Sequence, residues 1–100
     1  MVASRDVFRV SETDLKRVIK DYLAVKHIYN FPIMQGLGSQ PGLPDRIMHF
    51  KGQVHYLEIK KPKGKLSAHQ LKFQEQCKED KIPYHVLYSI EDLQNIMEGE

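Results

Sequence analysis

The segment between residues 45 and 60 limits what this chain can fold into more than any other. It contains two runs of mostly apolar, β-branched and aromatic residues, 45–50 and 54–60, separated by Lys51-Gly52-Gln53. A connection this short, with a glycine in it, is typical of an antiparallel β-hairpin. We therefore expect these two runs to be the central strands of a β-sheet.

Two serine-led segments predict helices on either side of this hairpin. Ser11-Glu12-Thr13-Asp14 and Ser67-Ala68-His69-Gln70 have the spacing of capping boxes, and Val10 and Leu15 are placed to form a hydrophobic staple at the first. Glycines and a proline mark residues 35–42 as a loop. The predicted elements are a helix from about residue 12 to about residue 28, an edge strand at 31–34, the two hairpin strands, a helix from about residue 68 to about residue 80, a strand at 84–88 and a short helix after Ser89.

Chain length and composition bound the architecture. One hundred residues are enough for one small domain, which we expect to span residues 1–100, and 41% hydrophobic residues can supply its core. The α-β-β-β-α-β-α order predicts an α/β fold built on one sheet. The single Cys77 excludes an internal disulfide. With no signal peptide and no apolar stretch of about 18 residues, we expect a cytoplasmic protein without a membrane span.

One face of the second hairpin strand carries an acid and a lysine side by side. Because side chains alternate across a strand, Glu58 and Lys60 point to the same side. The antiparallel hairpin also brings Asp45, at the start of the first strand, near Glu58 or Lys60. Two carboxylates at one end of a sheet repel each other unless a cation joins them, and Mg²⁺ or Mn²⁺ prefers such oxygen ligands. These residues predict a metal site with Asp45, Glu58 and the Ile59 backbone carbonyl as ligands.

Such a site indicates hydrolysis of a phosphodiester bond. The metal would polarise the phosphate and lower the pKa of a bound water, and Lys60 would orient that water or stabilise charge on phosphorus. Seven lysines but only three acidic residues lie between residues 60 and 81. This segment is therefore either a surface for the phosphate backbone of DNA or a solvated helix face with its preceding loop.

Three motifs taken together resemble a known family. Gly42-Leu43-Pro44-Asp45, then Glu58-Ile59-Lys60 after twelve intervening residues, then Leu66-Ser67-Ala68-His69-Gln70 are similar to the VRR-NUC branch of the PD-(D/E)xK nuclease superfamily. The Val-Arg-Arg sequence that gives the branch its name is not present. The resemblance implies a restriction-endonuclease-like αβββαβ core with a mixed four-stranded sheet flanked by helices. It also implies Mg²⁺- or Mn²⁺-dependent DNA cleavage, as in stand-alone phage or bacterial nucleases that act on branched DNA such as four-way junctions.

The same resemblance implies roles for individual residues. Asp45 and Glu58 would bind the metal, Lys60 would be the catalytic lysine, and Gln70 would be a further catalytic residue on the second helix. Glu12 would add an acid near the metal, with stabilisation of the helix dipole as the alternative role of a first-turn glutamate. Gln70 also has an alternative, because it stands in the fourth place of a capping box.

DNA contacts and assembly follow from the same interpretation. Lys61, Lys63 and Lys65 come directly after the catalytic strand, where they would hold the phosphate backbone. Resolving a four-way junction requires two symmetric cuts, which predicts a homodimer. The first helix and the strand at 31–34 are its expected interface elements. The alternative function is that of a non-catalytic DNA-binding module with the same fold.

Overall fold

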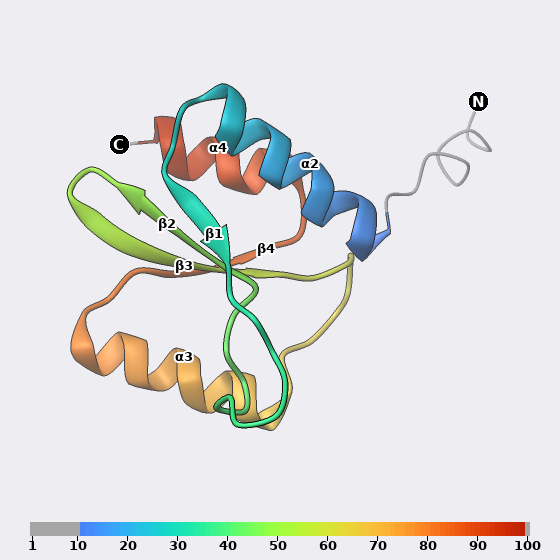
Figure 1. Cartoon of the computed structure of the whole chain (residues 1–100), viewed down its shortest axis with the longest axis vertical. Helices are drawn as coiled ribbons and strands as arrows, with labels where there is room; N and C mark the ends of the chain where they lie inside the picture. Colours follow the sequence, from blue (N-terminus) through green and yellow to red (C-terminus); the bar gives the residue numbers. More distant parts are fainter. Residues whose placement is uncertain (1–10, 100) are drawn as a thin grey trace.

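A computed structural model describes residues 11–99, so Val10 of the expected staple lies outside the described residues. The order of helices and strands is the one expected from the sequence, as Figure 1 shows. The elements are α2 (Glu12–Val25), β1 (Asn30–Pro32), β2 (Arg46–Phe50), β3 (Gln53–Ile59), α3 (Ala68–Asp80), β4 (Tyr84–Leu87) and α4 (Ile90–Glu98).

The four strands form one mixed sheet in the order β1-β2-β3-β4. β2 is antiparallel to both β1 and β3, whereas β4 is parallel to β3. Phe50 pairs with Gln53, so the hairpin turn consists only of Lys51 and Gly52. Both have positive φ angles, 53° and 78°, as in a type I′ turn, and a glycine adopts this conformation at little cost. The predicted α/β fold with a mixed four-stranded sheet is confirmed.

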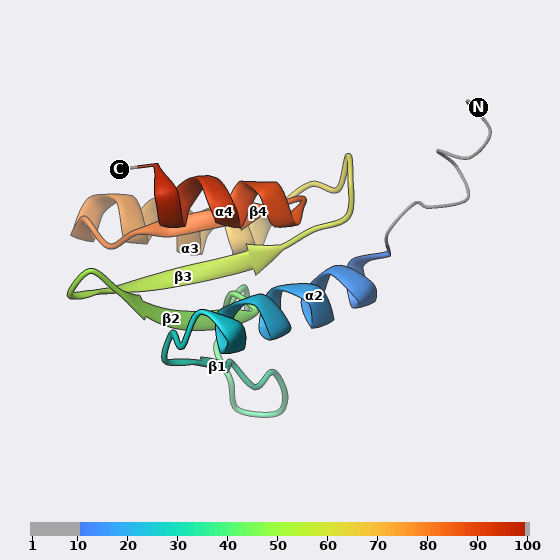
Figure 2. The same ribbon diagram turned by 90° about the horizontal axis from the view of Figure 1, so that it is seen from above.

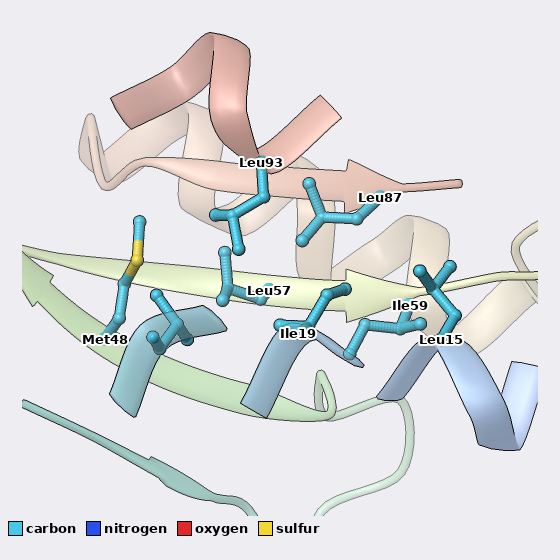
Figure 3. Close-up of a cluster of buried hydrophobic side chains, with 8 residues drawn as sticks. Leu15, Ile19, Met48, Leu57, Ile59, Leu87 and Leu93 are labelled. Atoms are coloured by element: carbon cyan, nitrogen blue, oxygen red, sulfur yellow. The ribbon is translucent and has the colours of Figure 1, made fainter. Parts of the chain in front are cut away.

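Helices cover both faces of the sheet. α2 and α4 lie together on one face and α3 lies on the other (Figures 1 and 2). The buried residues Leu15, Ile19 and Leu23 recur every four positions of α2 and so form one stripe along it. This stripe packs against the sheet and α4 in a single apolar cluster (Figure 3), whose members are Leu15, Ile19, Leu23, Met48, Leu57, Ile59, Leu87 and Leu93.

The alternation of side chains along β3 decides what lies on the other face. Leu57 and Ile59 face the cluster with α2 and α4, so Tyr56 and Glu58 face α3. Phe73 of α3 packs edge-on against Tyr56, with ring centroids 5.0 Å apart. α3 therefore lies over the face of the sheet that carries the acidic residue.

The start and the end of α2 differ in detail from the expectation. Ser11 caps the helix by accepting a hydrogen bond from the amide of Asp14, but the Asp14 carboxylate pairs with Arg17 instead of returning to Ser11. The helix ends at Val25 and not near residue 28, because His27 takes a positive φ of 59°. The amide of Ile28 then donates to the Leu23 carbonyl and closes the helix end.

The edge strand is shorter than expected and lies closer to the N-terminus. β1 pairs with β2 from Asn30 to Pro32, and the Ile33 amide adds one more hydrogen bond, 2.9 Å long, to the Asp45 carbonyl. Beyond it Met34 turns outward and is 78% exposed. Among the helices within residues 11–99, none is long and apolar enough to span a membrane.

Candidate active site

Asp45, which immediately precedes β2, is fixed by its backbone and by one of its carboxylate oxygens. The preceding Pro44 is fully buried, and the Asp45 amide donates to the Leu57 carbonyl at 3.0 Å. Because Arg46 pairs with Leu57, Asp45 stands opposite Glu58, as the hairpin predicted. Asp45 Oδ2 accepts a 2.7 Å hydrogen bond from the Ile59 amide. The second oxygen, Oδ1, takes no part in this hydrogen bond.

Glu58 is a buried acid whose two oxygens have different surroundings. Its Oε2 accepts a 3.1 Å hydrogen bond from Gln70 Nε2 and lies 3.8 Å from Lys60 Nζ. Its Oε1 is buried without a hydrogen-bond partner. Burial, with a smaller contribution from the negative charge of Asp45, raises the pKa of Glu58 to about 7, against the lowering effect of Lys60. The structure thus brings Asp45, Glu58, Lys60 and Gln70 together at one end of the sheet.

Gln70 has both of the roles that the sequence left open, as a helix cap and as a residue of the site. Its Oε1 accepts from the amide of Ser67 at 2.8 Å and completes the capping box of α3. Its Nε2 meanwhile donates to Glu58. One side chain therefore fixes the start of α3 and the orientation of the Glu58 carboxylate.

Lys16 was not singled out by the sequence, yet it lies within the site. Its Nζ is 3.3 Å from Asp45 Oδ1 and 3.6 Å from Glu12 Oε2, so one ammonium joins two carboxylates. The four-residue spacing of Glu12 and Lys16 predicts their own ion pair. It does not reveal that α2 places this pair beside Asp45, which is a consequence of tertiary packing.

The donor set fits a divalent cation. Mg²⁺ is usually held by one or two carboxylates and keeps several waters, and Asp45 with Glu58 matches that number. A cation held by both residues would also satisfy Glu58 Oε1, a buried acceptor without a hydrogen-bond partner. No group of three or more His, Cys, Asp or Glu side chains within residues 11–99 is close enough to hold a metal. Glu12 is instead held by Lys16 at the edge of the site.

The three lysines expected to bind DNA lie in the loop between β3 and α3. Lys61, Lys63 and Lys65 are all exposed, and Lys63 has a positive φ of 67°. Lys60, which precedes them, is mostly buried, with 17% of its side chain exposed. Lys60 therefore points toward Glu58, whereas the lysines that follow it within a few residues are exposed to solvent.

Comparison with known proteins gives a match in structure only. No family model matches the sequence, and no curated protein matches it. A solved structure described as a VRR_NUC domain superposes with a TM-score of 0.75 at 17% sequence identity, covering 91% of this chain and 99% of that chain. The resemblance expected from the three sequence motifs is therefore confirmed in the fold.

Proposed function

We propose that this chain, which has the fold of a VRR_NUC domain, is a metal-dependent endonuclease that hydrolyses DNA phosphodiester bonds. The observation that carries the proposal is the environment of Glu58. A buried carboxylate is held by Gln70 and Lys60 on one oxygen, keeps the other oxygen without a partner, and stands beside Asp45. An arrangement that leaves a buried acid incompletely satisfied is expensive for stability and is typical of a ligand site.

Each residue of the site would have a distinct role in the reaction. When bound, Mg²⁺ or Mn²⁺ would supply Lewis acidity and a water of lowered pKa. Asp45 and Glu58 would hold the ion, with the Ile59 backbone carbonyl as the further ligand. Gln70 keeps Glu58 Oε2 engaged and so leaves Oε1 for the ion. Lys60 would stabilise the negative charge that develops on the phosphate or orient the attacking water.

Two loops beside the site would contact the DNA. The exposed Lys61, Lys63 and Lys65 would bind the phosphate backbone. The glycine-rich loop at 35–42 packs on the start of α3, where a Cβ on Gly42 would come within 2.4 Å of the His69 carbonyl oxygen. This close approach fixes the loop next to the site. We propose branched DNA, such as a four-way junction, as the preferred substrate, because the loop would reach the strands that leave the branch point.

The test is cleavage of supercoiled, linear and four-way-junction DNA with Mg²⁺, Mn²⁺ or EDTA. Asp45→Asn and Glu58→Gln should lower cleavage by several orders of magnitude and leave DNA binding in Ca²⁺ little changed, because these groups hold the metal and the lysines hold the backbone. Asp21→Asn, an exposed acid on α2, is the matched control and should cleave like the wild type. Wild-type cleavage by either site variant would remove the metal-site hypothesis. DNA binding without cleavage by the wild type would favour the non-catalytic alternative.

A further inference from the structure

We propose that Lys16 is a built-in competitor of the metal: its ammonium holds Asp45 and Glu12 when no divalent cation is bound, and it must leave Asp45 for the cation to bind there. The inference rests on the proposed metal-dependent function. It assigns Lys16 a positioning role that sets metal affinity.

The two carboxylate oxygens of Asp45 are not equally available to a metal. Oδ2 is engaged by the Ile59 amide at 2.7 Å, a hydrogen bond that ties Asp45 to β3. Oδ1 is the oxygen that Lys16 Nζ approaches, at 3.3 Å. Oδ2 keeps a lone pair beside its hydrogen bond, but Oδ1 is the oxygen that has no backbone partner. A metal bound through Oδ1 would meet the Lys16 ammonium there. Lys16 and the metal then compete for one atom.

The Lys16 ammonium is held in place by two carboxylates. An exposed ion pair between two flexible side chains contributes little, because ordering the side chains offsets the attraction. The Lys16 and Glu12 side chains are 45% and 38% exposed, one helical turn apart on α2, but the ammonium meets Asp45 as well and so has two carboxylates at once. The Asp45 side chain is only 23% exposed, which weakens the screening by water. The ammonium is thus a positive charge that the fold holds next to Asp45.

Without a metal, Lys16 also affects the electrostatic balance of the site. Glu12, Asp45 and Glu58 are acidic groups of one region, and Asp45 and Glu12 both act to raise the pKa of Glu58. Lys16 offsets part of this repulsion. Removing its charge would leave an acidic region with a stronger attraction for a doubly charged cation. Charges a few ångströms apart at a partly exposed position interact by an amount that corresponds to about tenfold in a binding constant.

The experiment measures Mn²⁺ binding to the full chain without DNA, from the electron paramagnetic resonance signal of free Mn²⁺. We expect Lys16→Met to bind Mn²⁺ about tenfold more tightly than the wild type, and Lys16→Gln to do the same. Lys16→Arg, which keeps the charge, should stay close to the wild type. Lys20→Met is the matched control, because Lys20 is exposed one turn further along α2. In thermal unfolding, Mn²⁺ should raise the Tm of Lys16→Met more than that of the wild type.

Two other results would separate failure of this inference from failure of the proposed function. If Asp45→Asn abolishes Mn²⁺ binding while Lys16→Met and Lys16→Gln bind like the wild type, the metal site stands and the role of Lys16 is overturned. If neither the wild type nor any Lys16 variant shows binding that Asp45→Asn removes, the metal site fails and the role of Lys16 fails with it. Circular dichroism of each variant checks that it is folded.

Discussion

Glu58 is only 3% exposed, and its pKa is raised to about 7, first by burial and then by the charge of Asp45. In the unfolded chain its pKa is close to the ordinary value of 4.5. Between these two values the folded state binds more protons than the unfolded state. The contribution of Glu58 to stability is therefore present at low pH and is lost as the pH rises through this window.

The Glu58→Gln variant should show how much stability the protein loses when Glu58 ionises. In EDTA, we expect it to be more stable than the wild type at pH 8 by on the order of 2 kcal/mol and to differ little from it near pH 4.5, because glutamine cannot ionise. Urea unfolding at a series of pH values measures the difference. Glu79→Gln, an exposed acid on α3, is the control and should follow the wild type. A stability difference that does not change with pH would contradict the raised pKa of Glu58.

The sequence predicts some neighbours of the site residues and misses others. The proximity of Asp45, Glu58 and Lys60 follows from strand alternation and a tight hairpin, both of which are local rules. The contact of Lys16 with Asp45 does not, because it depends on how α2 lies against the sheet. Gln70 is intermediate, since its capping bond is local while its bond to Glu58 depends on the packing of α3.

The elements themselves were predictable where periodicity and capping signals agree. Ser67 and Gln70 predicted the start of α3 correctly. The alternation of side chains in β3 predicted the face of the sheet on which Glu58 lies. The end of α2 was not predictable, because His27 takes a left-handed backbone conformation that residues other than glycine rarely adopt. β1 was misplaced by one residue at its start, since its limits are set by pairing with β2.

The loop between β3 and α3 carries three exposed lysines that we expect to bind DNA. Replacing Lys61, Lys63 and Lys65 together by glutamine should weaken binding to all DNA sequences alike. It should also flatten the dependence of log affinity on log salt, by roughly one unit for each phosphate that the loop no longer binds. Fluorescence anisotropy in Ca²⁺ at several salt concentrations measures both effects.

A matched triple variant controls for the loss of charge alone. Lys20, Lys26 and Lys51 lie on or just after α2 and in the hairpin turn, and Lys51, like Lys63, has a positive φ. Replacing these three by glutamine removes the same charge and should leave the salt dependence close to that of the wild type. If the two triple variants bind alike, the loop lysines are a solvated surface and the attraction is only that of net charge.

The sheet ends in two edge strands, β1 and β4, and several exposed apolar side chains lie near β1. β1 is an edge strand, and such a strand offers unpaired backbone groups to a partner. Next to it, Tyr29 is 65% exposed and packs against Phe31 and His49. Val18 and Val25 of α2 are also exposed. These are the elements that the sequence indicated as a dimer interface.

We expect this surface to join two copies of the chain. A homodimer would present two sites related by a twofold axis, as symmetric cleavage of a four-way junction requires. Replacing Phe31 and Met34 by glutamate should therefore give a monomer that loses paired cuts on a junction and still nicks DNA. Leu71→Glu, a change of the same kind on α3, should remain dimeric. Sedimentation equilibrium with and without a synthetic junction, together with cleavage mapping on each strand, measures the outcome. A wild-type chain that is a strict monomer and nicks branched and linear duplexes equally would defeat both the dimer and the junction preference.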